Sequence, residues 1–149
     1  MRTRWIVAGA LFACAGCGSA PQKHEFDKSR TVTQSYDQTW EDIVSFFASR
    51  NIQVKNIAKD SGVIYAEEAE VDPTDADCGK PPALWRPISN QGRFNVFVKR
   101  GEQKQVVSVN AQFAQVLQTE IANPPSTQTV SCTSTGMLER QILQSLTTQ

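Results

Sequence analysis

Apolar residues recur at helical spacing in two stretches of this chain. In the first stretch, residues 38–50, they follow an i, i+3, i+4, i+7 pattern at Trp40, Ile43, Val44 and Phe47. Residues at that spacing share one face of an α-helix, so the pattern predicts a helix whose apolar face, widened by Phe46, packs into the core. Asp37 is the predicted N-cap. A surface for a partner is the alternative use of the same face.

The second helical stretch lies near the C-terminal end of the chain. Ser134 is placed to cap it, and the helix is predicted to end near Leu146. Its apolar positions are Met137, Leu138, Ile142, Leu143 and Leu146. We expect all five side chains to be buried.

Strict alternation of apolar and polar residues, which is typical of strands with one buried face, marks other segments. Alternation, β-branched residues and turn signals together predict six strands, at residues 30–36, 52–57, 63–67, 93–99, 105–117 and 128–133. A sheet with one apolar and one polar face is antiparallel and is covered by helices on one side only. The sequence therefore predicts a single α+β domain over residues 30–149, with an antiparallel sheet of about six strands and two helices on one face, a two-layer sandwich.

Residues 68–91 show neither the helical spacing nor the strand alternation of apolar residues. Four prolines interrupt them, and a loop of this length inside a compact domain is usually functional or else held in place by a crosslink. Leu84, Trp85 and Arg86 are the best candidates for partner binding in this loop, since Trp and Arg are enriched at interaction hot spots. The alternative is that Trp85 closes one end of the core.

Six acidic residues gather at the start of the same loop: Glu67, Glu68, Glu70, Asp72, Asp75 and Asp77. Several carboxylates close together in a chain can form a calcium loop. Counted from Asp75, however, one ligand position of an EF-hand falls on Gly79 and the bidentate position falls on Arg86. Neither residue carries a carboxylate, so we expect a solvated acidic loop, no metal site and no cofactor.

Cys78 and Cys132 are the two cysteines outside the N-terminal region, and an even pair in an exported chain favours a disulfide. The bond would close a loop of about 55 residues and contribute on the order of 4 kcal/mol through chain entropy. Two free thiols and a redox pair are the alternatives. A zinc site lacks ligands, because the single histidine, His24, is distant in the chain.

The first residues have the three parts of a secretory signal. Residues 1–4 are basic, residues 5–13 carry no charge, and small residues and cysteines follow. The apolar run is about half of the roughly 20 residues that a membrane span needs. The segment resembles a bacterial lipoprotein signal, in which a leucine and two small residues precede a cysteine that is acylated and becomes the first mature residue. A buried N-terminal segment with incidental cysteines is the alternative.

Two cysteines fit the acceptor position of that signal. Cys14 has the favoured leucine three positions before it, whereas Cys17 has the better small neighbours. The signal peptide is therefore residues 1–13, or residues 1–16 if Cys17 is the acceptor. Residues 14–29 are then a lipidated, flexible tether of polar composition.

Loss of the leader also changes the charge of the chain. Fifteen basic residues balance fifteen acidic ones, and removal of Arg2 and Arg4 leaves a net charge of −2. The charge therefore does not favour electrostatic binding to anionic lipid, and the acyl chains must attach the protein to the membrane. The residue after the modified cysteine, Ala15 or Gly18, is not Asp. In enterobacterial-type sorting, the resemblance then implies the outer membrane, with the domain facing the periplasm.

Three short motifs lie within residues 30–68: Tyr36-Asp-Gln-Thr-Trp-Glu-Asp, Asn51-Ile-Gln-Val and Asp60-Ser-Gly-Val-Ile-Tyr65. A strand leads into a helix that begins near a tryptophan, and a hairpin follows. This organisation is similar to that of the domains in BamC (NlpB) type lipoproteins of the outer-membrane assembly machinery. The resemblance implies a helix-grip-like α+β fold and carries no catalytic residues.

Composition also excludes some classes of function. The zero net charge argues against a basic nucleic-acid binder, and the position of His24 in the tether removes most histidine-based catalysis. We expect a membrane-anchored lipoprotein of the bacterial cell envelope, not an enzyme, that acts as a binding or scaffold module in an envelope complex with an envelope protein as partner. An envelope hydrolase acting on peptidoglycan or glycan, and a carrier of a small ligand or lipid, are the alternatives.

Overall fold

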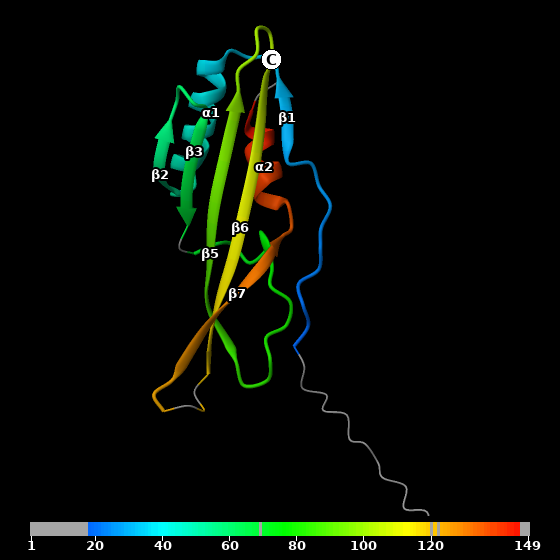
Figure 1. Ribbon diagram of the computed structural model, residues 1–149, viewed down its shortest axis with the longest axis vertical. Coiled ribbons are helices and arrows are strands. Elements are labelled where there is room, and N and C mark those ends of the chain that lie inside the picture. The colour runs from blue at the N-terminus through cyan, green and yellow to red at the C-terminus, as the bar shows by residue number, and fades with distance from the viewer. Residues whose placement is uncertain (1–17, 69, 120, 122, 147–149) are drawn as a thin grey trace, which may run out of the picture.

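The computed structural model describes residues 18–68, 70–119, 121 and 123–146 (Figure 1). The predicted leader and both candidate lipid acceptors, Cys14 and Cys17, lie outside the described residues. In chain order the elements are β1 (Ser29–Val32), α1 (Tyr36–Ser49), β2 (Gln53–Ala58), β3 (Val63–Glu68), β4 (Ala76–Asp77), β5 (Arg86–Lys99), β6 (Gln105–Thr119), β7 (Ser126–Ser134) and α2 (Met137–Ser145).

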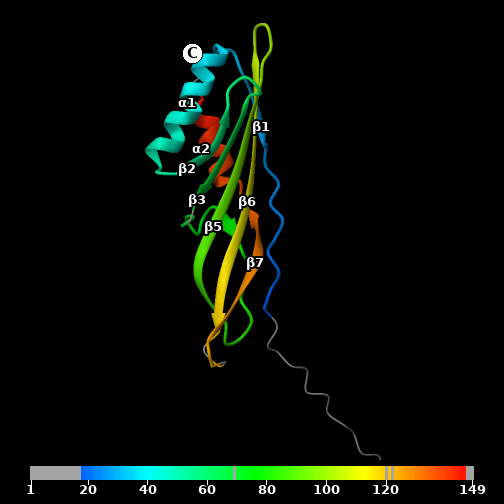
Figure 2. The ribbon, with the colours of Figure 1, turned by 60° about the vertical axis from the view of Figure 1, so that its left-hand side comes forward.

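Among the described residues, seven strands form an antiparallel open sheet. Both helices lie on the same side of this sheet, as the turned view in Figure 2 shows. The predicted α+β class, with its antiparallel sheet and two helices, is confirmed.

The strands are ordered β2-β3-β5-β6-β7-β4 across the sheet, and β1 pairs with β6 outside this path. β5 occupies one edge of β6, so β1 and β7 share the other edge. β1 pairs with residues 105–108 and β7 with residues 113–119. In the gap between them the N–H of Val109 donates to the carbonyl oxygen of Lys28 at 2.8 Å. The chain before β1 therefore continues along the sheet into this gap.

The core lies between the helices and the sheet. Both helices bury the apolar faces that their spacing predicts: Trp40, Ile43, Phe47, Leu138, Ile142, Leu143 and Leu146. They pack with inward-facing residues of the central strands: Ile64, Ala66, Phe94, Val96, Val98, Val107 and Val109. Val44 and Phe46 are half-buried at the margin of this cluster. The helical face of residues 38–50 is thus core.

The start of α1 differs from the predicted one. Its N-cap is Ser35, whose hydroxyl oxygen accepts a hydrogen bond from the N–H of Gln38 at 3.2 Å. Asp37, the predicted cap, lies inside the first turn, where its carboxylate pairs with Lys59 at 2.9 Å. Spacing locates a helix, but the residue at which the backbone turns helical decides which polar side chain caps it.

The start of α2 also differs. Gly136, with a left-handed φ of 78°, is its N-cap position, so the predicted cap Ser134 lies before the helix. The Ser134 hydroxyl instead donates to the Glu139 carboxylate at 2.9 Å. Met137, which we expected to be buried, is the first helical residue and is 38 % exposed.

The segment predicted to be irregular, residues 68–91, contains strand structure. β5 begins at Arg86, and Pro87 is paired with Leu117 before a bulge that ends at Ser89. Proline has no N–H for a ladder and is tolerated where a bulge interrupts the pairing. The bulge also breaks the alternation, which is why the pattern places the start of this strand too late.

β5 and β6 extend beyond the part of the sheet that the helices cover (Figure 1). We call the helix-covered part, with β1, β2 and β3, the proximal half. The distal half consists of residues 86–91, 114–119 and 126–131. Loop residues 71–82 and chain residues 18–21 line its inner face, where Leu117 is 1 % exposed.

Cys78 and Cys132, 54 positions apart in the sequence, form a disulfide with sulfurs 2.01 Å apart. Cys132 lies in β7 and pairs with Phe113 of β6. The bond therefore attaches the loop to the sheet where the two halves meet, and the predicted pairing is confirmed.

Candidate functional site

Residues 18–28, which we call the N-terminal segment, lie along the domain and form several contacts with it (Figure 1). Ser19 forms a bridge with Lys80, whose N–H donates to the Ser19 carbonyl oxygen at 3.1 Å. At the other end of the segment, Phe26 packs against Gly136. A Cβ at Gly136 would lie 2.3 Å from the Phe26 ring, so only glycine leaves room for this contact.

Asp77 is the main polar contact of the N-terminal segment. Its carboxylate accepts hydrogen bonds from the backbone N–H groups of Gly79 at 2.8 Å and Gln22 at 3.1 Å, and it lies 3.3 Å from the ring nitrogen of His24. These bonds, led by the one from Gly79, hold the pKa of Asp77 below its usual value. Asp77 directly precedes the disulfide-bonded Cys78, so the covalent bond and the docking contact stabilise one small region.

Leu84, Trp85 and Arg86, the predicted partner-binding residues, lie where β5 begins. Leu84 is 72 % exposed and adopts a left-handed φ of 74°, which is uncommon for a bulky side chain. Trp85 is half-buried and is not part of the core cluster, while its N–H donates to the Pro82 carbonyl oxygen at 3.1 Å. Arg86 donates to the side chain of Gln118 at 3.2 Å.

Two further exposed apolar residues lie near this triplet. Ile88 in the bulge is 48 % exposed, and Ile121, just beyond the end of β6, is 68 % exposed. Arg86 pairs with Gln118, so the chain before Arg86 and the chain after β6 leave the sheet at the same end. We call Leu84, Trp85, Arg86, Ile88 and Ile121 the distal tip. Sequence analysis found the first three, but Ile121 joins them only through the strand register.

The acidic loop is only partly solvated, and Asp75 corrects that expectation. Its side chain is 1 % exposed and lies 3.7 Å from the Arg50 guanidinium. Burial raises the pKa of Asp75, while Arg50 opposes the shift. Burial likewise raises the pKa of Glu68. Within the part of the chain that the structure describes, no three His, Cys, Asp or Glu side chains are placed to hold a metal ion.

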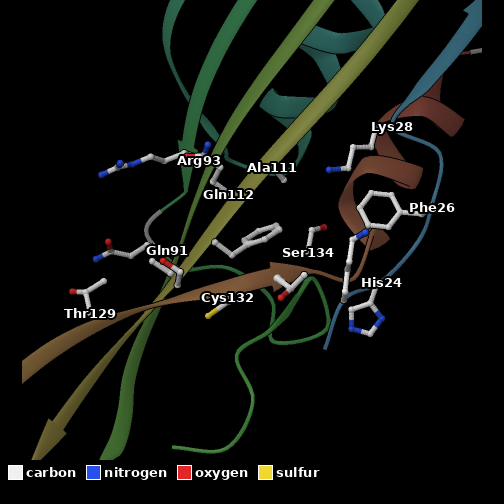
Figure 3. Close-up of a pocket in the computed structure, with 15 residues that line it drawn as sticks. His24, Phe26, Lys28, Gln91, Arg93, Ala111, Gln112, Thr129, Cys132 and Ser134 are labelled. Atoms are coloured by element: carbon white, nitrogen blue, oxygen red, sulfur yellow. The ribbon is translucent and has the colours of Figure 1, made fainter. Parts of the chain in front are cut away.

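A cleft of about 520 Å³ lies between the N-terminal segment and the sheet (Figure 3). Its ionisable lining residues are Lys23, His24, Lys28 and Arg93, and no described lining residue carries a carboxylate. Hydroxyl and amide groups complete the polar lining: Gln91, Gln112, Thr129, Ser131, Thr133 and Ser134. Figure 3 shows the Lys28 side chain extending from the N-terminal segment toward β6. The cleft therefore combines basic side chains with hydroxyl and amide groups, a lining that can bind an anionic group. Three of the ionisable residues also have a carboxylate nearby: Lys23 lies 2.6 Å from Glu25, His24 lies 3.3 Å from Asp77, and Arg93 lies 3.9 Å from Glu67.

Neither this cleft nor the docking of the N-terminal segment was expected from sequence. Asp77 and Gln22 are 55 residues apart in the chain, and Phe26 and Gly136 are even farther apart. Local periodicity contains no signal for such pairs. Gly136 is the signal that could have been used, because a glycine near the start of a helix can mark a special backbone position, but it does not indicate Phe26 as the partner.

Within the described ranges, neither helix has the length and apolar character of a membrane span. No protein-family model matches the chain, and no curated protein matches it in sequence.

Proposed function

We propose that this protein is a lipid-anchored, non-enzymatic binding or scaffold module of the bacterial cell envelope, attached to the outer membrane and facing the periplasm. The observation that carries the proposal is the position at which the chain meets the domain. Gly18 and Ser19, the first described residues, already contact the domain, and in the sequence they directly follow the two cysteines that fit a lipoprotein signal. The disulfide adds support, because such bonds persist in exported proteins.

The short chain between the anchor and the domain determines which end of the domain faces the membrane. An extended chain spans at most about 3.6 Å per residue. Ser19 is two residues after Cys17 and five after Cys14. The acyl chains would therefore hold Ser19 within about 7 Å of an acylated Cys17, or about 18 Å of an acylated Cys14. Ser19 contacts Lys80, so the distal half is the part of the domain held at the membrane.

The distal tip is the contact surface of this proposal. It combines exposed apolar side chains with Trp85 and Arg86, the residue types enriched at binding hot spots. Attachment to the membrane raises the effective concentration of any component that the tip meets there. The resemblance of residues 30–68 to BamC-type domains supports a place in an envelope complex.

Labelled palmitate tests the anchor in an exporting bacterium. The wild-type chain is expected to take up the label, and the Cys14→Ser/Cys17→Ser double variant is expected to lose it. Each single variant shows which cysteine is the acceptor. Label retained by the double variant would contradict the proposal.

Photo-crosslinking in cells tests the contact surface. A photoreactive residue at Leu84 is expected to give a defined product that disappears in the double cysteine variant. The same residue at Asp60, in the β2–β3 turn of the proximal half, is the control. Absence of any product from Leu84 would place the functional surface elsewhere.

The cleft in Figure 3 favours binding of a small anionic ligand as a second candidate function. Lys28 and Arg93 are the residues to change, and Lys99, at the end of β5 away from the cleft, is the matched control. Inorganic phosphate is expected to raise the melting temperature of the wild type and of Lys99→Gln. The same rise is expected to be lost in Lys28→Gln/Arg93→Gln. Equal rises in all three proteins would rule out this site.

A further inference from the structure

We propose that the distal tip inserts its apolar side chains into the membrane that holds the acyl anchor, so that the partner of this surface is the lipid bilayer itself. The inference rests on the proposed lipid anchor and names what the tip contacts. Three independent features of the described residues support it: the direction in which the loops point, the exposure of the side chains, and the contact of Gly18 and Ser19 with the loop that carries the tip.

The strand register brings the apolar residues to one end of the molecule. Arg86 opens β5 and pairs with Gln118, one residue before the end of β6. Leu84 precedes this pair and Ile121 follows it, so both lie beyond the last rung of the β5–β6 ladder. Figure 1 shows these loops at the lower end, opposite the β5–β6 turn and far from both helices.

The side chains at this end are unusually exposed. Leu84 at 72 % and Ile121 at 68 % are the two most exposed large apolar residues in the described ranges, and Ile88 follows at 48 % beside Ile57 at 49 %. Leu84 adopts a left-handed φ of 74°, which is uncommon for a bulky side chain. Trp85 next to it is half-buried, and tryptophan prefers the boundary between acyl chains and headgroups.

The first described residues of the N-terminal segment, Gly18 and Ser19, contact the loop at the same end. Gly18 packs so closely on the loop that a Cβ there would lie 2.4 Å from the Lys80 carbonyl oxygen. Lys80 is four residues before Leu84 in the same loop. The chain between Gly18 and an acylated cysteine has at most three residues, so the bilayer must lie close to this loop.

The charged residues of the region are compatible with shallow insertion. Lys80 and Arg86 are exposed, and long basic side chains can place their stems along apolar surface while the charge stays in water. Glu120 precedes Ile121 in sequence and lies outside the described residues. Since the mature chain has a net charge of −2, the apolar side chains and not the overall charge would drive the contact.

Quenching by brominated lipid tests the insertion. The full chain carries Trp5→Leu and Trp40→Phe, so that Trp85 is its only tryptophan. The protein is expressed with labelled palmitate, purified from membranes and reconstituted into vesicles of phosphatidylethanolamine and phosphatidylglycerol with brominated acyl chains. Bromine quenches tryptophan at short range, so Trp85 fluorescence is expected to fall relative to unbrominated vesicles.

Two matched variants assign the effect to the tip. Leu84→Asn with Ile121→Asn is expected to return Trp85 fluorescence to the level seen in unbrominated vesicles, since asparagine tolerates the backbone of Leu84. Ile57→Asn, an equally polar change at an exposed residue of the proximal half, is expected to leave quenching unchanged. Circular dichroism melting checks that each variant is folded, and a tip variant that unfolds is replaced by Leu84→Ser alone.

The possible results separate the two proposals. Quenching that depends on the tip residues supports insertion. Unquenched Trp85 in palmitate-labelled protein overturns the insertion and leaves the lipid anchor standing. Absence of palmitate overturns the anchor, and with it the insertion. A crosslink in cells from Leu84 to one defined protein, and not to lipid, also overturns the insertion.

Discussion

The proximal and distal halves of the sheet share β5 and β6 but are stabilised in different ways. In the proximal half, two helices cover the sheet, and most of the fully buried side chains are aliphatic or aromatic. In the distal half, Leu117 is a buried apolar residue, but its neighbours Gln115 and Thr119 are polar. Gln115 donates to Asn90 at 2.9 Å, and the cover is a loop attached by the Cys78–Cys132 disulfide.

This difference shows how one sheet can provide both stability and a contact surface. Burial of apolar area gives the proximal half a favourable free energy without help from covalent bonds. The distal half buries little apolar area and leaves Leu84 and Ile121 exposed, so it depends on the disulfide and on docking of the N-terminal segment. The proposed functional surface lies in the distal half, where fewer side chains are buried in the core.

The largest effect is expected in the proximal core. Phe47 is fully buried in α1, so Phe47→Ala should lower the free energy of unfolding by about 3–5 kcal/mol through lost burial and a residual cavity. Chemical denaturation measures the change. Phe46→Ala, at a half-buried neighbour, is the control and should cost clearly less. Equal losses from both would mean that the cost of a substitution in α1 does not follow the burial of the side chain in the proximal core.

Removal of the disulfide should destabilise the protein by about 2–4 kcal/mol, because the unfolded chain regains the freedom that the bond removes. The Cys78→Ala/Cys132→Ala variant should also speed amide hydrogen exchange in residues 114–119, while β3 stays protected. Reductant should have the same effect on the wild type and none on the variant. Uniform loss of protection would show that both halves depend on the bond.

The buried carboxylate at the junction of the halves should make stability depend on pH. Burial raises the pKa of Asp75, so between its ordinary and raised values the folded protein binds more protons than the unfolded one. Asp75 therefore lowers the free energy of unfolding as pH rises through that interval. Denaturation at several pH values should show a flatter profile for Asp75→Asn.

Asp72→Asn provides a control of opposite sign. Hydrogen bonds from Thr74 lower the pKa of Asp72, so its contribution to stability is lost as pH falls. Removing it should lessen the loss of stability at pH values below the ordinary pKa of an aspartate and leave the decline above that value unchanged. A profile that neither variant alters would show that these carboxylates have the same pKa in the folded and unfolded chain.

The smallest effect on global stability is expected from Asp77→Ala, which removes the acceptor for Gln22 and weakens docking of the N-terminal segment. Limited proteolysis should cut residues 18–28 faster, while the melting temperature changes little. Glu25→Ala changes an exposed acid in the same segment that pairs only locally with Lys23, and should leave the cleavage rate unchanged. Unchanged cleavage in Asp77→Ala would mean that other contacts hold the segment.

Local pattern was sufficient for much of the fold. The apolar faces of both helices, the β2–β3 and β5–β6 hairpins and the Cys78–Cys132 pairing follow from periodicity, turn residues and cysteine count. These features are encoded within a few residues, or in a pair with no competing partner. The triplet Leu84, Trp85 and Arg86 was also recognisable, since a tryptophan between prolines in a polar loop is conspicuous.

Other features depend on contacts that local pattern cannot encode. Pro87 lies in a strand only because a bulge accommodates it, and Asp75 is buried only because the loop folds back beside Arg50. Ile121 reaches the distal tip through strand register, and the N-terminal segment docks through residues more than 50 positions away. The sequence by itself determined the helix and sheet layers, because their apolar pattern repeats within a turn or a strand. It also determined the disulfide, because two cysteines lie outside the N-terminal region. Only the tertiary structure decided which distant residues became neighbours, because packing across the sheet selects those contacts.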